Sequence, residues 1–128
     1  MNLKSIIYVK DEPDIRHIVK LHLTKNGIVV HDFNSGLRAL ECAPDPPPDL
    51  MLLDVMMRDI DGQATLSKLR EIEAYENVPC IFFTAKADAS TLEMLNSFPN
   101  TAVIYKPFKM KSFFADLQQH YQALSSNN

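Results

Sequence analysis

The chain has 128 residues, of which 46% are hydrophobic, with a net charge of −3 and a sequence pI of about 5.7. This length fits one domain that buries enough apolar surface to fold unaided. The acidic balance argues against direct nucleic-acid binding, which needs a basic surface, and no apolar stretch approaches the roughly 20 residues that cross a membrane.

Five short apolar runs predict β-strands. They cover residues 6–9, 28–30, 50–53, 81–83 and 102–105. Most are continuously apolar rather than alternating, which is typical of strands that are buried on both faces of a parallel sheet.

Helical patterns follow each run. The first ends at Asn26-Gly27, the second is capped by Ser35, the third covers residues 63–74, the fourth begins at residues 88–90, and the fifth begins near Met110. The side chains expected on the buried faces are Ile15, Ile18, Val19, His22 and Leu23, then Leu37, Leu40 and Ala43, then Leu66, Leu69 and Ile72, then Leu92, Leu95 and Phe98, and finally Phe113, Phe114, Leu117, Tyr121 and Leu124.

Strands and helices alternate five times, so the pattern predicts an α/β fold of the (βα)5 type with a parallel sheet. Right-handed crossovers favour the doubly wound, flavodoxin-like order 2-1-3-4-5, with helices on both faces. We expect a single domain over residues 1–128, with a core of about 5–124 and a frayed polar tail at 125–128.

The two cysteines form neither a disulfide framework nor a zinc-binding spacing. Cys80 lies inside an apolar run, so we expect it to be buried. Because residues 1–7 lack the pattern of a signal peptide, a reduced, cytoplasmic chain is the simplest interpretation.

Polar residues follow the predicted strands at the edge where parallel sheets bind ligands. Asp11 follows the first strand, Asp54 the third, Thr84 the fourth and Lys106 the fifth. Asp54 is a candidate nucleophile for a phosphoryl group. Asp11, Asp54 and the backbone carbonyl of Met56 are candidate Mg²⁺ ligands, while Lys106 and Thr84 offer donors to phosphoryl oxygens, which is most of what phosphoryl transfer requires.

With these residues in this order, the sequence resembles the receiver domain of response regulators in two-component systems, over about residues 6–124. The resemblance is carried by Val9-Lys10-Asp11-Glu12-Pro13, Leu52-Leu53-Asp54-Val55-Met56-Met57, Asp61-Gly62, Phe83-Thr84-Ala85 and Tyr105-Lys106-Pro107-Phe108.

The resemblance implies a phosphoacceptor role for Asp54, Mg²⁺ binding at Asp11, Asp54 and the Met56 carbonyl, and switching through Thr84 and Lys106, with a cis bond before Pro107. It further implies a histidine kinase or histidine phosphotransfer protein as donor. A downstream protein would bind the face formed by the fourth helix, fifth strand and fifth helix. Such a domain is not an enzyme beyond its own phosphoryl transfer and dephosphorylation.

Lys10 departs from the family pattern, because receivers usually carry two adjacent acids after the first strand. Two interpretations remain open. In one, the ammonium reaches Asp54 and competes with Mg²⁺; opposite charges about 4 Å apart attract by roughly 4 kcal/mol at an effective dielectric near 20. In the other, Lys10 extends into solvent and only weakens Mg²⁺ binding.

Three further positions bear on the site. Val103 stands where an aromatic switch residue is common, so coupling through a rotating ring is in doubt. Arg58 stands where proline is common, so either the loop is looser than usual or a cation lies near the pocket. Glu12 is a candidate modulator of the metal site, with a solvated or helix-capping role as the alternative.

The leading hypothesis is therefore a receiver that is phosphorylated on Asp54 with Mg²⁺ bound. The alternative is a pseudo-receiver, a protein-interaction module that needs no phosphorylation because Lys10 replaces an acid of the metal site. A flavodoxin-like enzyme is disfavoured because the three glycines are isolated and form no phosphate-binding loop.

Overall fold

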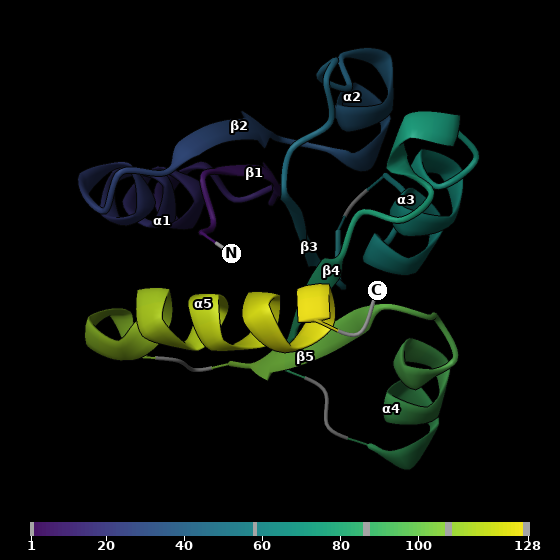
Figure 1. Cartoon of the computed structure of the whole chain (residues 1–128). Helices are drawn as coiled ribbons and strands as arrows, with labels where there is room; N and C mark the ends of the chain where they lie inside the picture. The colour runs from purple at the N-terminus through teal and green to yellow at the C-terminus, as the bar shows by residue number, and fades with distance from the viewer. Residues whose placement is uncertain (1, 58, 86–87, 107–108, 127–128) are drawn as a thin grey trace.

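A computed structural model describes residues 2–57, 59–85, 88–106 and 109–126. In these ranges five strands form one parallel sheet of order β2-β1-β3-β4-β5, as predicted (Figure 1). The strands are β1 (Ser5–Val9), β2 (Val29–Phe33), β3 (Leu50–Asp54), β4 (Cys80–Thr84) and β5 (Thr101–Tyr105). The helices are α1 (Pro13–Lys25), α2 (Gly36–Glu41), α3 (Gly62–Leu69), α4 (Ala89–Asn96) and α5 (Met110–Ser126), with a 3₁₀ turn η1 (Glu73–Tyr75).

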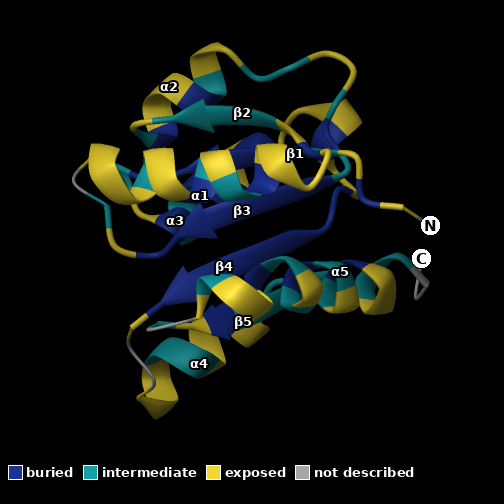
Figure 2. Ribbon diagram, turned by 90° about the vertical axis from the view of Figure 1, so that its left-hand side faces the viewer, coloured by how far each residue is buried: buried dark blue, intermediate teal, exposed yellow. Residues whose placement is uncertain are grey.

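The sheet separates two hydrophobic clusters. Successive side chains of a strand point to opposite faces, so Ile6 of β1 packs with α1 and α5, whereas Ile7 packs with α2, α3 and α4. Figure 1 shows these two layers on either side of the sheet. The central strands β3 and β4 are buried along their whole length (Figure 2), which explains their continuous apolar sequence.

Several local predictions are confirmed. Helix α1 ends before Gly27, which has a φ of 84°. Its first residue is Pro13, whose fixed backbone angle suits this position. Ser35 caps α2 by accepting a hydrogen bond from the Arg38 N–H at 3.1 Å. Cys80 is fully buried. No helix in the described part of the chain is long and apolar enough to cross a membrane.

The buried face of α1 is narrower than predicted. Val19 and Leu23 are fully buried, but Ile15 is exposed and Ile18 is 54% exposed. The prediction was wrong for these two isoleucines because α1 contacts the sheet and α5 along one stripe only, so residues that flank this stripe face solvent. Leu37 of α2 is exposed as well, because this helix also meets the core along one face only. Ala39 lies on that face and is buried in the core.

Helix α3 is shorter than the predicted range of 63–74. It ends at Leu69, and Ile72 is exposed at the start of η1. The chain turns here through the backbone bonds from Glu71 N–H to the Lys68 carbonyl and from Ile72 N–H to the Leu69 carbonyl. The guanidinium of Arg70, directly after the helix, donates hydrogen bonds to the carbonyls of Pro99 and Val78. Ala43 and Phe98 likewise lie beyond the ends of α2 and α4, although both pack partly against the core.

The second strand also differs from its predicted range of 28–30. Strand β2 extends to Phe33 and includes His31 and Asp32. Because β2 is an edge strand that pairs only with β1, its side chains are not enclosed on every side, and it accommodates polar residues that the apolar pattern did not predict.

Gly62 lies against the backbone of the strand end that carries Asp54. A Cβ atom at Gly62 would lie 2.4 Å from the Asp54 carbonyl oxygen and 3.1 Å from the Val55 Cα. We therefore predict that Gly62→Ala lowers the free energy of unfolding by about 1–3 kcal/mol, because backbone atoms of β3 must shift. Urea unfolding measures this change. Ser67→Ala, at an exposed position of the same helix, is the control and should change it by less than about 0.5 kcal/mol; equal stabilities of the two variants would contradict the close approach.

Candidate functional site

The carboxyl ends of the strands bring polar residues to one edge of the sheet. Parallel pairing aligns Asp54 on β3 with Phe83 on β4, and Thr84 on β4 with Tyr105 on β5. Lys106 follows β5 directly, and its backbone N–H donates to the Thr84 carbonyl at 2.9 Å. The register thus places a carboxylate, a hydroxyl residue and an amine at neighbouring strand ends.

The carboxylate of Asp54 is buried and paired with two lysines. Its Oδ2 accepts a hydrogen bond from Lys10 Nζ at 2.7 Å, and its Oδ1 accepts one from Lys106 Nζ. The Asp54 side chain is 1% exposed, compared with 8% for Lys10 and 27% for Lys106. Because an unpaired buried charge is strongly destabilising, these two ammonium groups hold the carboxylate in its place.

Lys10 is anchored at both its backbone and its side chain. Its backbone N–H donates to the Phe33 carbonyl at 3.1 Å, and its carbonyl accepts a hydrogen bond from Arg16 Nη1 at 2.8 Å. Its Nζ lies 3.9 Å from Asp11 Oδ1 in addition to the contact with Asp54. Of the two interpretations of Lys10, the structure therefore has the ammonium on Asp54, and not in solvent.

The electrostatics favour a charged Lys10. Burial alone lowers the pKa of Lys10, but the hydrogen bond and negative charge of Asp54 outweigh burial, so its pKa lies above the ordinary value. Burial, followed by the charge of Asp54, raises the pKa of the Tyr8 phenol well above its ordinary value. Tyr8 is thus a neutral neighbour, while Lys10 is a cation at neutral pH.

The side chains around Asp54 do not fit the expected Mg²⁺ ion. Mg²⁺ takes oxygen ligands in a near-octahedral arrangement, whereas an ammonium offers only hydrogen-bond donors. The Lys10 ammonium lies within 3.9 Å of both candidate carboxylates, Asp11 and Asp54. A cation of the protein itself therefore stands where the two acids would share a metal.

The remaining predicted site residues are placed as follows. Thr84 is buried at the end of β4, and Met56 is exposed in the loop after β3. Glu12 is the exposed N-cap residue of α1, and its side chain makes no capping hydrogen bond. Arg58 and the peptide bond before Pro107 lie outside the described residues.

Sequence reasoning missed the residues that position Lys10. Arg16, which holds the Lys10 carbonyl, also contacts Asp32 Oδ2 through its Nε at 3.3 Å, and Lys20 Nζ donates to Asp32 Oδ1 at 2.8 Å. Two basic residues four apart lie on the same face of a helix, which was the only signal in the sequence. Their acidic partner, Asp32, lies on the strand β2 and not on the same helix, so the spacing alone did not predict it.

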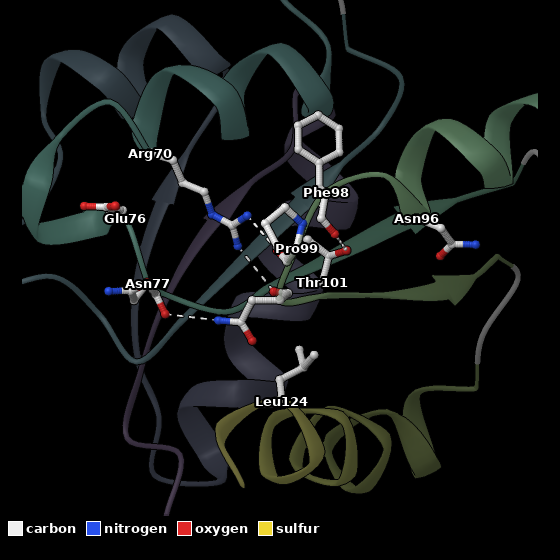
Figure 3. A pocket seen from close by; sticks show the side chains of 9 residues that line it. Arg70, Glu76, Asn77, Asn96, Phe98, Pro99, Thr101 and Leu124 are labelled. Carbon is white, nitrogen blue, oxygen red and sulfur yellow. Dashed lines mark hydrogen bonds between the residues drawn. The ribbon is translucent and has the colours of Figure 1, made fainter. Parts of the chain in front are cut away.

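A hollow at the opposite edge of the sheet, before β4 and β5, is structural rather than chemical (Figure 3). Arg70 donates to the carbonyls of Pro99 at 2.7 Å, Val78 at 3.2 Å and Asn100 at 3.3 Å. The Asn100 side chain in turn donates to the Asn77 carbonyl at 3.1 Å. Arg70 and Asn100 therefore join the loops around this hollow, and the candidate site residues lie at the opposite edge, which carries Asp54.

Comparisons with known proteins place this geometry in a wider context. The model of the response regulator receiver domain family matches residues 6–118. The transcriptional regulatory protein KdpE of Mycobacterium tuberculosis is 30% identical over 113 residues, which are 88% of this chain and 49% of that protein. The hybrid signal transduction histidine kinase D of Dictyostelium discoideum is 29% identical over 114 residues, which are 89% of this chain and 7% of that protein.

Solved structures agree on the fold. The chemotaxis protein CheY4 of Vibrio cholerae superposes with a TM-score of 0.84 at 23% identity, covering 92% of this chain and 98% of that one. This likeness supports the architecture alone. The chain spans about half the length of the mycobacterial relative that it matches.

The buried Lys10–Asp54 ion pair should couple the two side chains in stability. We predict a coupling free energy of about 1–3 kcal/mol between Lys10→Met and Asp54→Asn, measured by urea unfolding in a double-mutant cycle. The reason is that Lys10→Met leaves one oxygen of the buried Asp54 carboxylate without its donor, whereas Asp54→Asn leaves the buried Lys10 ammonium without its nearest counter-charge.

The exposed pair Arg38 and Glu41 is the matched control for this cycle. Its atoms Nη1 and Oε2 are 3.1 Å apart, but the side chains are 57% and 63% exposed. Solvent screening should keep the coupling between Arg38→Met and Glu41→Gln below about 0.5 kcal/mol. A Lys10–Asp54 coupling as small as that of the control would show that the ammonium does not hold the carboxylate.

Proposed function

The chain belongs to the response regulator receiver domain family, and from this premise we propose that it signals by accepting a phosphoryl group on Asp54. Receiver domains act as signalling domains in two-component systems. The observation that carries the proposal is the carboxylate of Asp54, 1% exposed at the end of β3, with the Lys106 ammonium bonded to one of its oxygens. Thr84 at the end of the adjacent strand β4 supports the same reading.

The proposed transfer starts from a phosphohistidine of a histidine kinase or a histidine phosphotransfer protein. A carboxylate oxygen of Asp54 attacks phosphorus, forming a P–O bond as the P–N bond breaks and its electron pair returns to the imidazole. Lys106 and Thr84 donate hydrogen bonds to the phosphoryl oxygens. Receiver domains generally bind Mg²⁺, but the residues around Asp54 do not fit it here, and no step of the proposed transfer passes through a metal.

The signal would leave the domain through a protein-binding face. A phosphoryl group adds a charge of about −1.5 to −2, which draws the Lys106 ammonium and the Thr84 hydroxyl toward Asp54. The affected face comprises α4, β5 and α5, where Met94 and Tyr105 are exposed. Val103 is the aliphatic residue at the family's aromatic position, so we assign the coupling to Thr84. The proposed partners are proteins, and neither nucleic acid nor a membrane is bound directly. The proposed location is the cytoplasm, where free thiols such as those of Cys42 and Cys80 stay reduced.

A phosphodonor experiment tests the proposal directly. We expect phosphoramidate, whose P–N bond resembles that of phosphohistidine, to add one phosphoryl group to the wild-type chain, detected by mass spectrometry of the intact protein. The adduct should be absent from Asp54→Ala. It should persist in Asp14→Asn, which removes an exposed carboxylate of α1. An adduct that survives in Asp54→Ala would refute Asp54 as the acceptor.

The Lys10–Asp54 contact favours a second candidate, a pseudo-receiver that binds partners without phosphorylation. In that case Lys10 holds Asp54 permanently and blocks the transfer. The same assay separates the candidates: the pseudo-receiver predicts no adduct on the wild-type chain under any condition. It further predicts that Lys10→Asp, which restores the acidic pair of the family, forms an adduct when Mg²⁺ is supplied.

A further inference from the structure

We propose that the Lys10 ammonium is the built-in cation of the acceptor site and takes the place of Mg²⁺, so that Asp54 is phosphorylated without a metal. This inference rests on the proposed phosphoacceptor function and states how that function operates in this chain. It starts from the misfit between the expected metal and the side chains that surround Asp54.

The positive charge of Lys10 lies close to both carboxylates that would bind the metal. Lys10 Nζ lies 2.7 Å from Asp54 Oδ2 and 3.9 Å from Asp11 Oδ1. A divalent ion bound to both carboxylates would lie beside this ammonium and be repelled by it. The two negative charges that would attract the metal are already balanced by the two positive charges of Lys10 and Lys106.

Lys10 is held in place by the residues around it. Its side chain is 8% exposed, and its backbone is fixed by the Phe33 carbonyl and the Arg16 guanidinium. Arg16 is itself fixed by Asp32, which also binds Lys20. Entry of a metal would require Lys10 to leave Asp54 while this surrounding network keeps its backbone at the site.

The two oxygens of the Asp54 carboxylate differ in their access to the phosphodonor. Lys106 is 27% exposed and bonds Oδ1, whereas Lys10 is 8% exposed and bonds Oδ2. The donor therefore reaches Asp54 from the Lys106 side, and Oδ1 is the oxygen that forms the P–O bond. Lys106 then moves from Oδ1 to a phosphoryl oxygen, while Lys10 stays on Oδ2.

The atoms and charges of this step balance without a further reagent. The P–N bond of the phosphoramidate or phosphohistidine donor breaks with its electron pair on nitrogen, which takes a proton from solvent. Lys10 keeps its own protons throughout, and its positive charge offsets the negative charge that gathers around phosphorus. Lys10 is thus a charge-neutralising residue at the reacting carboxylate, and Arg16 is a positioning residue behind it.

The test compares phosphorylation with and without metal. The wild-type chain is incubated with phosphoramidate in excess EDTA and, in parallel, in excess Mg²⁺, and the rate of adduct formation is followed by mass spectrometry. We expect the same rate in both solutions. Lys10→Met should be slower by about a hundredfold in EDTA, the usual effect of removing one electrostatic donor from a transfer site. Lys68→Met, which removes an exposed charge from the last turn of α3, should match wild type.

A second readout does not depend on phosphorylation. Thermal unfolding with increasing Mg²⁺ reports binding to the folded chain, because a ligand of the native state raises its Tm. We expect Mg²⁺ to leave the Tm of the wild-type chain unchanged and to raise that of Lys10→Asp, in which the acidic pair is restored. Lys10→Asp should also require Mg²⁺ for its adduct. These measurements stand even if Lys10→Met does not fold.

The failures of the two proposals are distinct. A wild-type adduct that forms only with Mg²⁺, or a Tm that Mg²⁺ raises in the wild type, overturns the built-in cation and leaves the phosphoacceptor function standing. A wild-type chain that forms no adduct in either solution, while Lys10→Asp forms one with Mg²⁺, overturns both and establishes the pseudo-receiver.

Discussion

A carboxylate that is buried at the end of a buried strand needs a positive partner, and the arrangement around Asp54 follows from that requirement. Asp54 receives two partners, one on each oxygen: Lys10 from the end of β1 and Lys106 from the end of β5. The order of the sheet makes this possible, because β3 pairs with β1 on one side and with β4 on the other, and β5 follows β4. Gly62 completes the arrangement by letting α3 approach the backbone of Asp54 closely.

The two edges of the sheet divide the work of the molecule. At the amino edge, before β4 and β5, the Arg70 guanidinium donates hydrogen bonds to backbone carbonyls and joins the loops that carry them. At the carboxyl edge, the charged side chains bond to one another, and Asp54 is their centre. This division is general for open parallel sheets, whose ligands bind beyond the carboxyl ends of the strands.

Lys10 stands where receivers of this family usually carry an acid. A cation in place of an acid changes what the site attracts: two carboxylates and two ammonium groups leave no excess negative charge for a metal. Its side chain is bonded to Asp54, while its backbone is bonded to Arg16 and Phe33. Under the proposed metal-free transfer, the chain would respond to its phosphodonor and its partners, and not to the supply of divalent cations.

The sequence by itself determined the architecture and indicated the edge of the sheet at which the candidate site residues lie. Continuous apolar runs marked the strands, the alternation with helices implied a parallel sheet, and the residues after each strand marked the edge where Asp54, Thr84 and Lys106 meet. Only the tertiary structure decided where the Lys10 ammonium lies, that Ile15 and Ile18 of α1 face solvent, and that α3 ends at Leu69. The physical reason is that strand patterns arise from neighbouring residues, whereas these features depend on partners far along the chain. Lys10 and Asp54 are 44 residues apart, and Arg70, just after the end of α3, bonds to a carbonyl 30 residues away. The periodicity of neighbouring residues does not tell which charged side chain will pair with a residue far along the chain.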